Sequence, residues 1–453
     1  MEVRTLSRVL VITVSLGALL LGCAGSSSVG EASGKMSPVA SSSVVAQTVA
    51  VDTVPQVSDA VTEWNQHAVN LALLTSSNLA PIQQTRVMAI VQVSMHDAVN
   101  GITRKYAAYL SPGPAPENAS TEAAAIAAAH HALRNLFMSQ ASSIDTAYLN
   151  SLAAHGLSEN DPGIEYGRDA AGAVLALRAN DFSAQAQYDY NPPGAGIPGV
   201  WIRLNNAPAL LPGWGNVTPF VLHNGSQFRP DAPPALNSER YAQDYNEIKI
   251  IGAANSPTRT TEQTQIAQFW RGSPTAIWNP ILRQVMATRD FDLSAKARAF
   301  ALFYLAAADS GIACWDAKYT YNFWRPQLAI RGGDLDGNDQ TAADASWLPL
   351  VPTPPHPEYP SGHTSNSSAM ATILEQLFGD DPGVRLVVTV SGITRQWDTF
   401  DEAVQEVIDA RVYSGIHFRT SDEVGARLGR QVAHFASTHA LRPCNKSGRS
   451  RCK

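Results

Sequence analysis

The segment 318–326 reads KYTYNFWRP and closes the longest apolar stretch of the chain. Apolar and small residues continue through this stretch, which predicts one long helix over 293–324. Lys318 and Arg325 are seven residues apart, two turns of an ideal helix, so we expect both cations on one helical face. Pro326 disfavours helical geometry at Arg325 and ends the helix there. Two such cations can reach one anion, although a solvated charged stripe is the plainer interpretation.

The chain on both sides of this stretch is also predicted to be helical. Strand-like alternation is scarce, whereas apolar residues recur at helical spacing. The predicted helices cover 60–74, 82–101, 120–139, 143–156, 163–180, 237–254, 260–272, 275–288, 364–379, 402–415 and 421–440. We therefore expect an all-α fold built from helical bundles.

A long segment rich in proline and glycine, 184–236, separates the two helical halves. A loop of this length inside a compact enzyme is uncommon unless it is functional. A plain inter-domain linker is the alternative, but this segment contains Trp201, Trp214, Phe220 and Phe228, which a solvated linker would not carry. We interpret it as a crossover that wraps the bundle and walls a site.

A second motif, PSGH at 360–363, follows a stiff proline-rich run and precedes an amphipathic helix. Ser361, Gly362 and His363 therefore lie at a helix N-terminus, where free N–H groups and the helix dipole favour an anion. Gly362 lets the backbone approach closely, Ser361 adds a hydroxyl donor, and His363 adds an acid or base. A simple serine N-cap is the alternative.

A third motif, RVYSGIH, occupies 411–417. A spacing of six does not place Arg411 and His417 on one ideal helical face, but they converge if the helix ends or bends near Ser414 and Gly415. A surface arginine with a capping histidine is the alternative. Together the three motifs supply three cations, a hydroxyl, a backbone nest and two imidazoles, which suit a tetrahedral or trigonal-bipyramidal oxyanion.

In this order the motifs resemble the signature of the vanadium-dependent haloperoxidase and type 2 phosphatidic-acid phosphatase superfamily: Lys-x6-Arg-Pro, Pro-Ser-Gly-His and Ser-Arg-x5-His. The signature spans 318–417, with Ala410 where the family usually has serine. Segments 96–100 and 227–230 also look like bacterial, haloperoxidase-like members. The resemblance implies the helical-bundle fold of vanadium haloperoxidases and acid phosphatases.

The resemblance also implies a vanadate cofactor and its ligands. His417 would be the apical ligand to vanadium. The groups that would neutralise or hydrogen-bond the oxygens of vanadate are Lys318, Arg325, Arg411, Ser361 and the Gly362 N–H. His363 would be the acid–base group of catalysis, and Lys318 would polarise the peroxide. Trp315 matches an aromatic residue beside the cofactor, and His356 occupies a position that tends to be histidine in bromide-oxidising relatives.

The implied activity is oxidation of a halide, bromide in particular, by hydrogen peroxide to hypohalous acid. The sequence does not identify an organic acceptor, and a homo-oligomer is compatible with it. A secreted acid phosphatase of the same superfamily, with a phosphohistidine at His417, is one alternative, and a non-catalytic oxyanion-binding lipoprotein is another. A multi-spanning lipid phosphatase is disfavoured because no mature stretch reaches about 18 consecutive apolar residues. A formal net charge of −6 argues against nucleic acid as a partner.

The N-terminus predicts export. A basic start precedes an apolar run that is too short to span a bilayer and ends in LLGC at 20–23. This resembles a lipobox with Cys23 as the lipidated residue, and Ala24 favours the outer membrane by known sorting rules. An ordinary signal peptide with an incidental cysteine is the alternative. We expect a protein lipid-anchored to the cell envelope, at the outer membrane or cell surface, or otherwise periplasmic or extracellular.

These observations divide the chain into five segments. They are a lipoprotein signal peptide (1–23), a flexible tether (24–57), an N-terminal helical region with the crossover (58–236), a catalytic helical bundle (237–442) and a polar tail (443–453).

The remaining cysteines have different expected roles. Cys444 and Cys452 flank the polar tail and could close a small disulfide loop in an oxidising compartment, with two unpaired thiols as the alternative. Cys314 lies in an apolar helical stretch and is expected to be a buried thiol rather than a nucleophile.

Overall fold

The computed structural model describes residues 58–111, 113–204 and 207–444, which belong to one compact unit. Within these ranges the regular secondary structure is helical apart from one two-stranded hairpin, which confirms the predicted all-α fold. The signal peptide with Cys23, the tether and Cys452 lie outside the described residues. The lipobox and the Cys444–Cys452 bridge therefore stay predictions, as does the domain boundary after residue 236.

Five helices precede the crossover. They are α1 (Ala60–Leu73), α2 (Pro81–Thr103), α3 (Thr121–Leu136), α4 (Ala141–Ala154) and α5 (Pro162–Arg178). The alanine run 123–129 of α3 is fully buried because α5 packs against it very closely. A Cβ on Gly163 of α5 would lie 2.5 Å from the carbonyl oxygen of Ser120, so glycine is required for this approach.

Eight helices and the hairpin follow the crossover. They are α6 (Glu239–Ile251), α7 (Thr261–Phe269), α8 (Pro274–Met286), α9 (Leu293–Tyr321), α10 (Pro326–Arg331), α11 (Gly362–Phe378), β1 (Leu386–Val390), β2 (Ile393–Trp397), α12 (Phe400–Tyr413) and α13 (Arg419–His439). The strands pair antiparallel, with Leu386 opposite Trp397. Every predicted helix is present, whereas the hairpin and α10 were not predicted.

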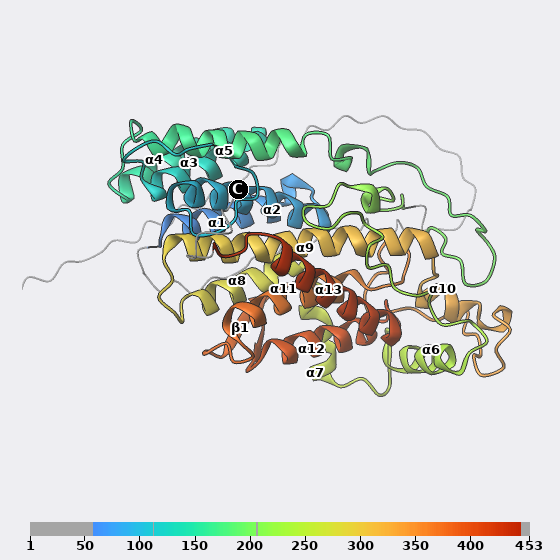
Figure 1. Cartoon of the computed structure of the whole chain (residues 1–453). Coiled ribbons are helices and arrows are strands. Elements are labelled where there is room, and N and C mark those ends of the chain that lie inside the picture. Colours follow the sequence, from blue (N-terminus) through green and yellow to red (C-terminus); the bar gives the residue numbers. More distant parts are fainter. Residues whose placement is uncertain (1–57, 112, 205–206, 445–453) are drawn as a thin grey trace, which may run out of the picture. The chain divides into compact units, whose positions relative to one another are not determined.

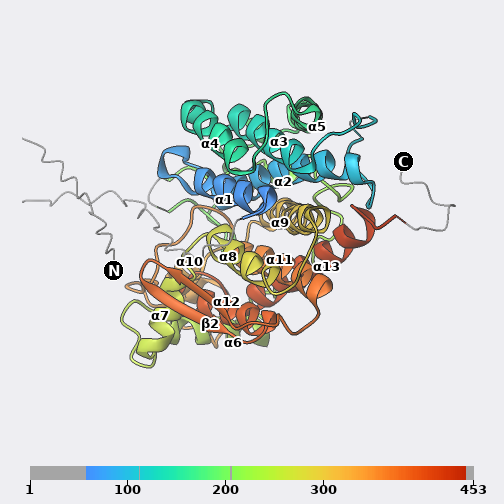
Figure 2. The ribbon, with the colours of Figure 1, turned by 90° about the vertical axis from the view of Figure 1, so that its left-hand side faces the viewer.

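Helix α9 is the central element of the described residues. Helices α1 and α2 contact one side of it, and α11 and α13 contact the other (Figure 1, Figure 2). Among the described helices only α9 is long and apolar enough to cross a membrane, but 94% of that apolar window is buried inside the protein. This burial is what a core helix of a globular bundle shows.

The crossover is packed onto the bundle rather than solvated. Trp201 and Trp214 are buried. Asp309 of α9 accepts hydrogen bonds from the backbone N–H groups of residues 220–222 at 2.6, 2.7 and 2.9 Å. Nearer the end of α9, the Leu210 carbonyl accepts from Trp315 Nε1 and Tyr319 Oη at 3.2 and 2.8 Å.

The crossover is thus fastened to the part of α9 that carries Lys318, as the interpretation of a wall beside the site requires. Its only regular structure within the described residues is two short 3₁₀ turns, Ser183–Gln185 and Trp214–Asn216.

The C-terminal end of α9 corrects one prediction. The helix ends at Tyr321, because Asn322 adopts left-handed geometry (φ 49°) and its N–H bonds to the Lys318 carbonyl. Arg325 is extended (φ −78°, ψ 153°) and is the N-cap of α10, in which Pro326 is the first residue. Lys318 and Arg325 therefore do not share a helical face, and the prediction that they do was wrong.

Candidate oxyanion site

Arg325 is the centre of the predicted site. It is fully buried, and its Nη1 lies 3.1 Å from His417 Nε2. Its Nη2 lies 2.9 Å from His356 Nδ1, and its Nε donates to the His356 carbonyl at 2.9 Å. The loop after α9 thus brings Arg325 back toward the motif that ends in His417, which a continuous helix could not do.

Lys318 reaches the same place from α9. Its Nζ is buried and donates to the carbonyls of Pro357 and Glu358 at 2.9 and 2.8 Å. Burial lowers the pKa of Lys318 to about 7. Its Nζ also lies 5.8 Å from the centroid of the Trp315 ring, which places Trp315 beside the site.

The N-terminus of α11 carries the second motif. Ser361 is the N-cap and Gly362 is the first helical residue, as predicted. However, Ser361 Oγ makes no capping hydrogen bond, although it is fully buried, and its hydroxyl interacts with the buried carboxyl of Asp422. The simple N-cap alternative therefore lacks the bond that defines it. A Cβ on Gly362 would lie 3.0 Å from the Trp315 ring, so glycine lets the indole pack against this turn.

His363 follows on α11 and is partly buried. Its Nε2 lies 3.2 Å from the carbonyl oxygen of Gly272. Because a carbonyl only accepts, Nε2 carries the proton of the neutral ring and Nδ1 is left as the basic atom. Burial, and then the charge of Arg411, hold the pKa of His363 well below its usual value.

In the third motif the helix ends next to Ser414 and Gly415, which is the condition under which Arg411 and His417 can converge. Helix α12 ends at Tyr413, and Gly415 follows in left-handed geometry (φ 77°). This turn brings Arg411 and His417 to the same cluster of charges. Arg411 Nη1 donates to the Trp270 carbonyl at 2.7 Å, while its buried Nε has no partner among the described residues.

Two acidic residues in the site were not predicted. Glu358 is fully buried, and its Oε1 lies 2.8 Å from His417 Nδ1. Asp422, in the first turn of α13, is also fully buried, and burial raises its pKa. The sequence feature that could have indicated Glu358 is that it is the acidic residue of the proline-rich run before the second motif. Asp422 gave no signal, since acidic residues are ordinary in the first turn of a helix.

The electrostatics of the site favour an anion. Lys318, Arg325 and Arg411 are all buried, and burial lowers the pKa of each arginine to about 10. Burying three cations together is costly unless negative charge accompanies them, and burial disfavours the charged form of the two neighbouring carboxyl groups, Glu358 and Asp422, by raising their pKa. The buried donors Ser361 Oγ and Arg411 Nε are groups of the kind that hydrogen-bond the oxygens of an anion.

His356 and Trp315 belong to the same cluster. Their ring centroids are 4.9 Å apart, and His356 is only 8% exposed. Burial, and then the charge of Arg325, hold the pKa of His356 well below its usual value. His356 is therefore part of the buried cluster and is not a surface residue of the proline-rich run.

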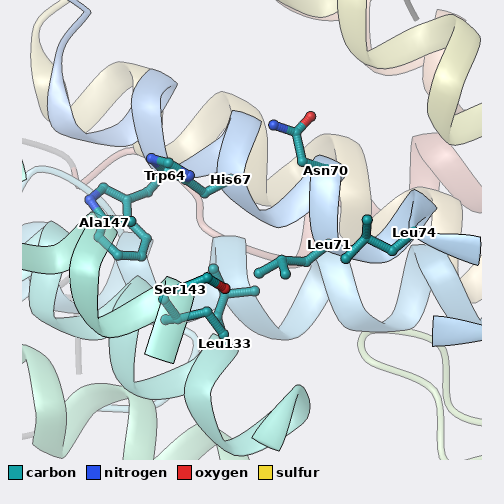
Figure 3. A pocket seen from close by; sticks show the side chains of 9 residues that line it. Trp64, His67, Asn70, Leu71, Leu74, Leu133, Ser143 and Ala147 are labelled. Atoms are coloured by element: carbon teal, nitrogen blue, oxygen red, sulfur yellow. The ribbon is translucent and has the colours of Figure 1, made fainter. Parts of the chain in front are cut away.

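One separate hollow lies between α1, α3 and α4, away from these motifs (Figure 3). Its lining is mostly apolar and includes Trp64, Leu71, Leu133 and Ile144. None of the predicted site residues lines it, so we do not associate it with the oxyanion site.

The fold and the site together define a helical protein with a buried cluster of cationic and imidazole side chains. Comparison with known proteins narrows this class. The family described as the VCPO second helical-bundle domain matches residues 298–446. The vanadium chloroperoxidase of Curvularia inaequalis is 26% identical over 405 residues, which cover 71% of this chain and 66% of that protein, just under two thirds of its length.

Solved structures show the same fold. A bacterial vanadium-dependent iodoperoxidase aligns with a TM-score of 0.71 at 24% identity, covering 85% of this chain and 96% of the other. The holo form of a bacterial vanadium-dependent chloroperoxidase aligns with a TM-score of 0.64 at 19% identity, covering 80% and 93%. These matches confirm the predicted resemblance to the vanadium haloperoxidase and type 2 phosphatidic-acid phosphatase superfamily.

Proposed function

We propose that this protein is a vanadate-dependent haloperoxidase that oxidises bromide and iodide with hydrogen peroxide to hypohalous acid. The observation that carries this proposal is that His417 Nε2 lies 3.1 Å from the buried Arg325 Nη1, and the buried cations Lys318 and Arg411 also act on this imidazole. The curated relative is a vanadium chloroperoxidase, which supports the class of chemistry but not the halide.

The residues of the site include a ligand for vanadium and donors for the oxygens of vanadate. His417 would offer the Nε2 lone pair. The negative charge of the vanadate oxygens would be balanced by Lys318, Arg325 and Arg411. Ser361 Oγ and the Gly362 N–H would donate hydrogen bonds to these oxygens. When bound, vanadate supplies the centre at which hydrogen peroxide is activated toward halide.

His363 is suited to moving the proton. Its Nε2–H is held on the Gly272 carbonyl, so protons would be taken up and returned at Nδ1. Because its pKa lies well below the usual value, the ring is neutral near pH 7 and can act as a base toward peroxide. Lys318 Nζ is the donor that we assign to polarising the peroxide.

We assign the halide preference to His356. This second imidazole is held by Arg325 Nη2 and by the Trp315 ring, so it changes polarity and proton supply close to the reacting atoms. We expect oxidation of bromide and iodide, and little or none of chloride. Steady-state bromination and chlorination of one dye at matched pH and vanadate test this. Equal chloride and bromide turnover would contradict it, as would a His356→Ala variant with an unchanged pH profile for bromide.

A secreted acid phosphatase is the second candidate, because the same cations fit a phosphate and His417 could attack phosphorus. Halogenation of a phenol dye with peroxide, with and without added vanadate, is measured beside hydrolysis of nitrophenyl phosphate. We expect vanadate-dependent halogenation, which His417→Ala abolishes while the protein stays folded. Full peroxidase activity in His417→Ala would contradict the assignment. Phosphate hydrolysis alone would favour the phosphatase, and vanadate binding without either turnover would favour a binding lipoprotein.

A further inference from the structure

His417 lies between two groups that decide which of its ring nitrogens bears the proton. Its Nε2 is 3.1 Å from Arg325 Nη1, and a guanidinium can only donate. Nε2 must therefore present its lone pair. The proton of the neutral ring is then on Nδ1, which lies 2.8 Å from Glu358 Oε1. The carboxylate of Glu358 is thus the acceptor that matches this tautomer.

Glu358 is itself held at several points. Its Oε1 also accepts the Phe418 N–H at 3.0 Å, next to the histidine that it contacts. Its own N–H donates to the Phe323 carbonyl at 2.9 Å, and its carbonyl accepts from Lys318 Nζ at 2.8 Å. The side chain is fully buried, and its other oxygen, Oε2, has no hydrogen-bond partner among the described residues.

Arg325 would not prevent His417 from binding an oxyanion. Its Nη1 also donates to the Ile416 carbonyl at 2.8 Å, so it keeps a partner when an oxyanion takes the Nε2 lone pair. The ring orientation then depends on the Nδ1 side, where Glu358 is the contact within hydrogen-bond distance. A carboxylate behind a ligating histidine fixes its tautomer and raises the basicity of the ligating nitrogen.

We propose that Glu358 is a positioning residue that holds His417 with Nδ1 protonated and Nε2 directed at the oxyanion. Glu358 is not part of the three-motif signature, and its role follows from the contacts of this chain. The proposal rests on the proposed function in one respect only, that the oxyanion is vanadate.

The first test is the tautomer of His417 in the intact protein without vanadate. The ring ¹⁵N resonances of histidine-labelled protein are recorded and assigned with His417→Ala. We expect a protonated Nδ1 and an unprotonated Nε2 in the parent, and a change at His417 in Glu358→Ala. A protonated Nε2 in the parent would overturn the proposal, whether or not the protein proves to be a peroxidase.

The second test is vanadate affinity, measured by calorimetry on variants with matched melting temperatures. Glu358→Ala should bind vanadate about 10- to 100-fold more weakly, the usual cost of losing such a partner. Glu358→Gln keeps an accepting oxygen in a side chain of the same shape, so it should lose less and remains informative if Glu358→Ala fails to fold. Glu247→Gln removes one negative charge from an ion pair with Arg419 outside the site, and should match the parent.

The double variant Glu358→Ala, His417→Ala separates positioning from a general structural effect. If Glu358 acts through His417, its removal should not weaken vanadate binding further once His417 is absent. An equal loss with and without His417 would overturn the proposal. A parent protein that binds no vanadate would contradict the proposed function, and the tautomer spectrum would still decide the role of Glu358.

Discussion

At the scale of single residues, the three buried cations should act on one ligand. Replacing Lys318, Arg325 or Arg411 with alanine should each weaken vanadate or phosphate binding, by about 1.5–3 kcal/mol for a lost charged hydrogen-bond partner. Calorimetry measures this. Arg229→Ala is the control, since its exposed guanidinium pairs with Asp316 outside the site. Unchanged affinity in all three site variants would refute a shared site.

His96 should make the fold sensitive to acid. It is fully buried in α2, its Nε2 bonds to the Ala107 carbonyl, and its Nδ1 has no partner among the described residues. Burial lowers the pKa of His96 from 6.5 to about 4. Between these pH values the unfolded chain binds a proton that the folded chain does not, so stability present above pH 6.5 is lost as the pH falls.

The expected loss from His96 is about 3 kcal/mol between pH 6.5 and 4, since each pKa unit corresponds to about 1.4 kcal/mol. Melting temperatures across this range measure it. His96→Gln should show a shallower decline than the parent, whereas the exposed His223→Gln should not. An identical decline in the parent and His96→Gln would show that other groups cause the acid sensitivity.

The residues of the site were predictable where a chemically distinctive side chain lies next to residues that begin or end a helix. Ser361 and His363 follow a proline-rich run at a helix start, and His417 follows a glycine that ends a helix. Glu358 was not predictable, because a glutamate among prolines is ordinarily solvated and only the fold buries it against His417. Arg325 was found for a wrong reason, since Asn322 ends α9 earlier than the periodicity suggested.

At the scale of elements, two glycines of α13 set its distance from α11. A Cβ on Gly425 would lie 2.6 Å from the Ser361 carbonyl oxygen, and one on Gly429 would contact the Ser365 carbonyl oxygen. Gly425→Ala should therefore displace the turn that carries Ser361. We expect a destabilisation of about 1–3 kcal/mol, as for other overpacked sites, together with weaker vanadate binding.

The matched control for Gly425→Ala is Gly172→Ala in α5. Nothing lies within 4 Å of a Cβ at Gly172, so alanine should stabilise the helix by up to about 1 kcal/mol. Gly429→Ala should destabilise the fold but affect vanadate less, because its contact lies one turn from Ser361. Differential scanning calorimetry and vanadate titration measure both effects. Parent-like values for Gly425→Ala would contradict the close-packing argument.

Most of the helices were predictable because apolar residues recur in them at helical spacing. The hairpin was not predictable, because β1 lacks the alternation of polar and apolar residues that marks a half-buried strand. Val387 points outward with 42% exposure, yet it is as apolar as its buried neighbours Leu386 and Val388. Helix α10 is only six residues long, too short for periodicity to reveal.

At the scale of the whole molecule, we propose that the protein is exported and anchored by a lipid on Cys23. This segment lies outside the described residues, so the proposal rests on the LLGC motif alone. Cys23→Ser should release a protein that otherwise partitions into the detergent phase, because a covalent lipid is the expected source of membrane affinity. Phase partition and mass spectrometry of the N-terminus measure this. Parent protein with an unmodified N-terminus at Ala24 or beyond would contradict it.

The burial of α9 on both sides also has a consequence during synthesis. Helices α1 and α2 are made before it, but α11 and α13, which cover its other side, are made later. A chain that extends only to α10 therefore leaves one side of the apolar helix α9 uncovered, and such a surface binds chaperones and promotes aggregation. Chains truncated before α11 should accumulate in the insoluble fraction. The C-terminal helices α11 and α13 are thus synthesised last, and they complete both the hydrophobic core and the candidate oxyanion site.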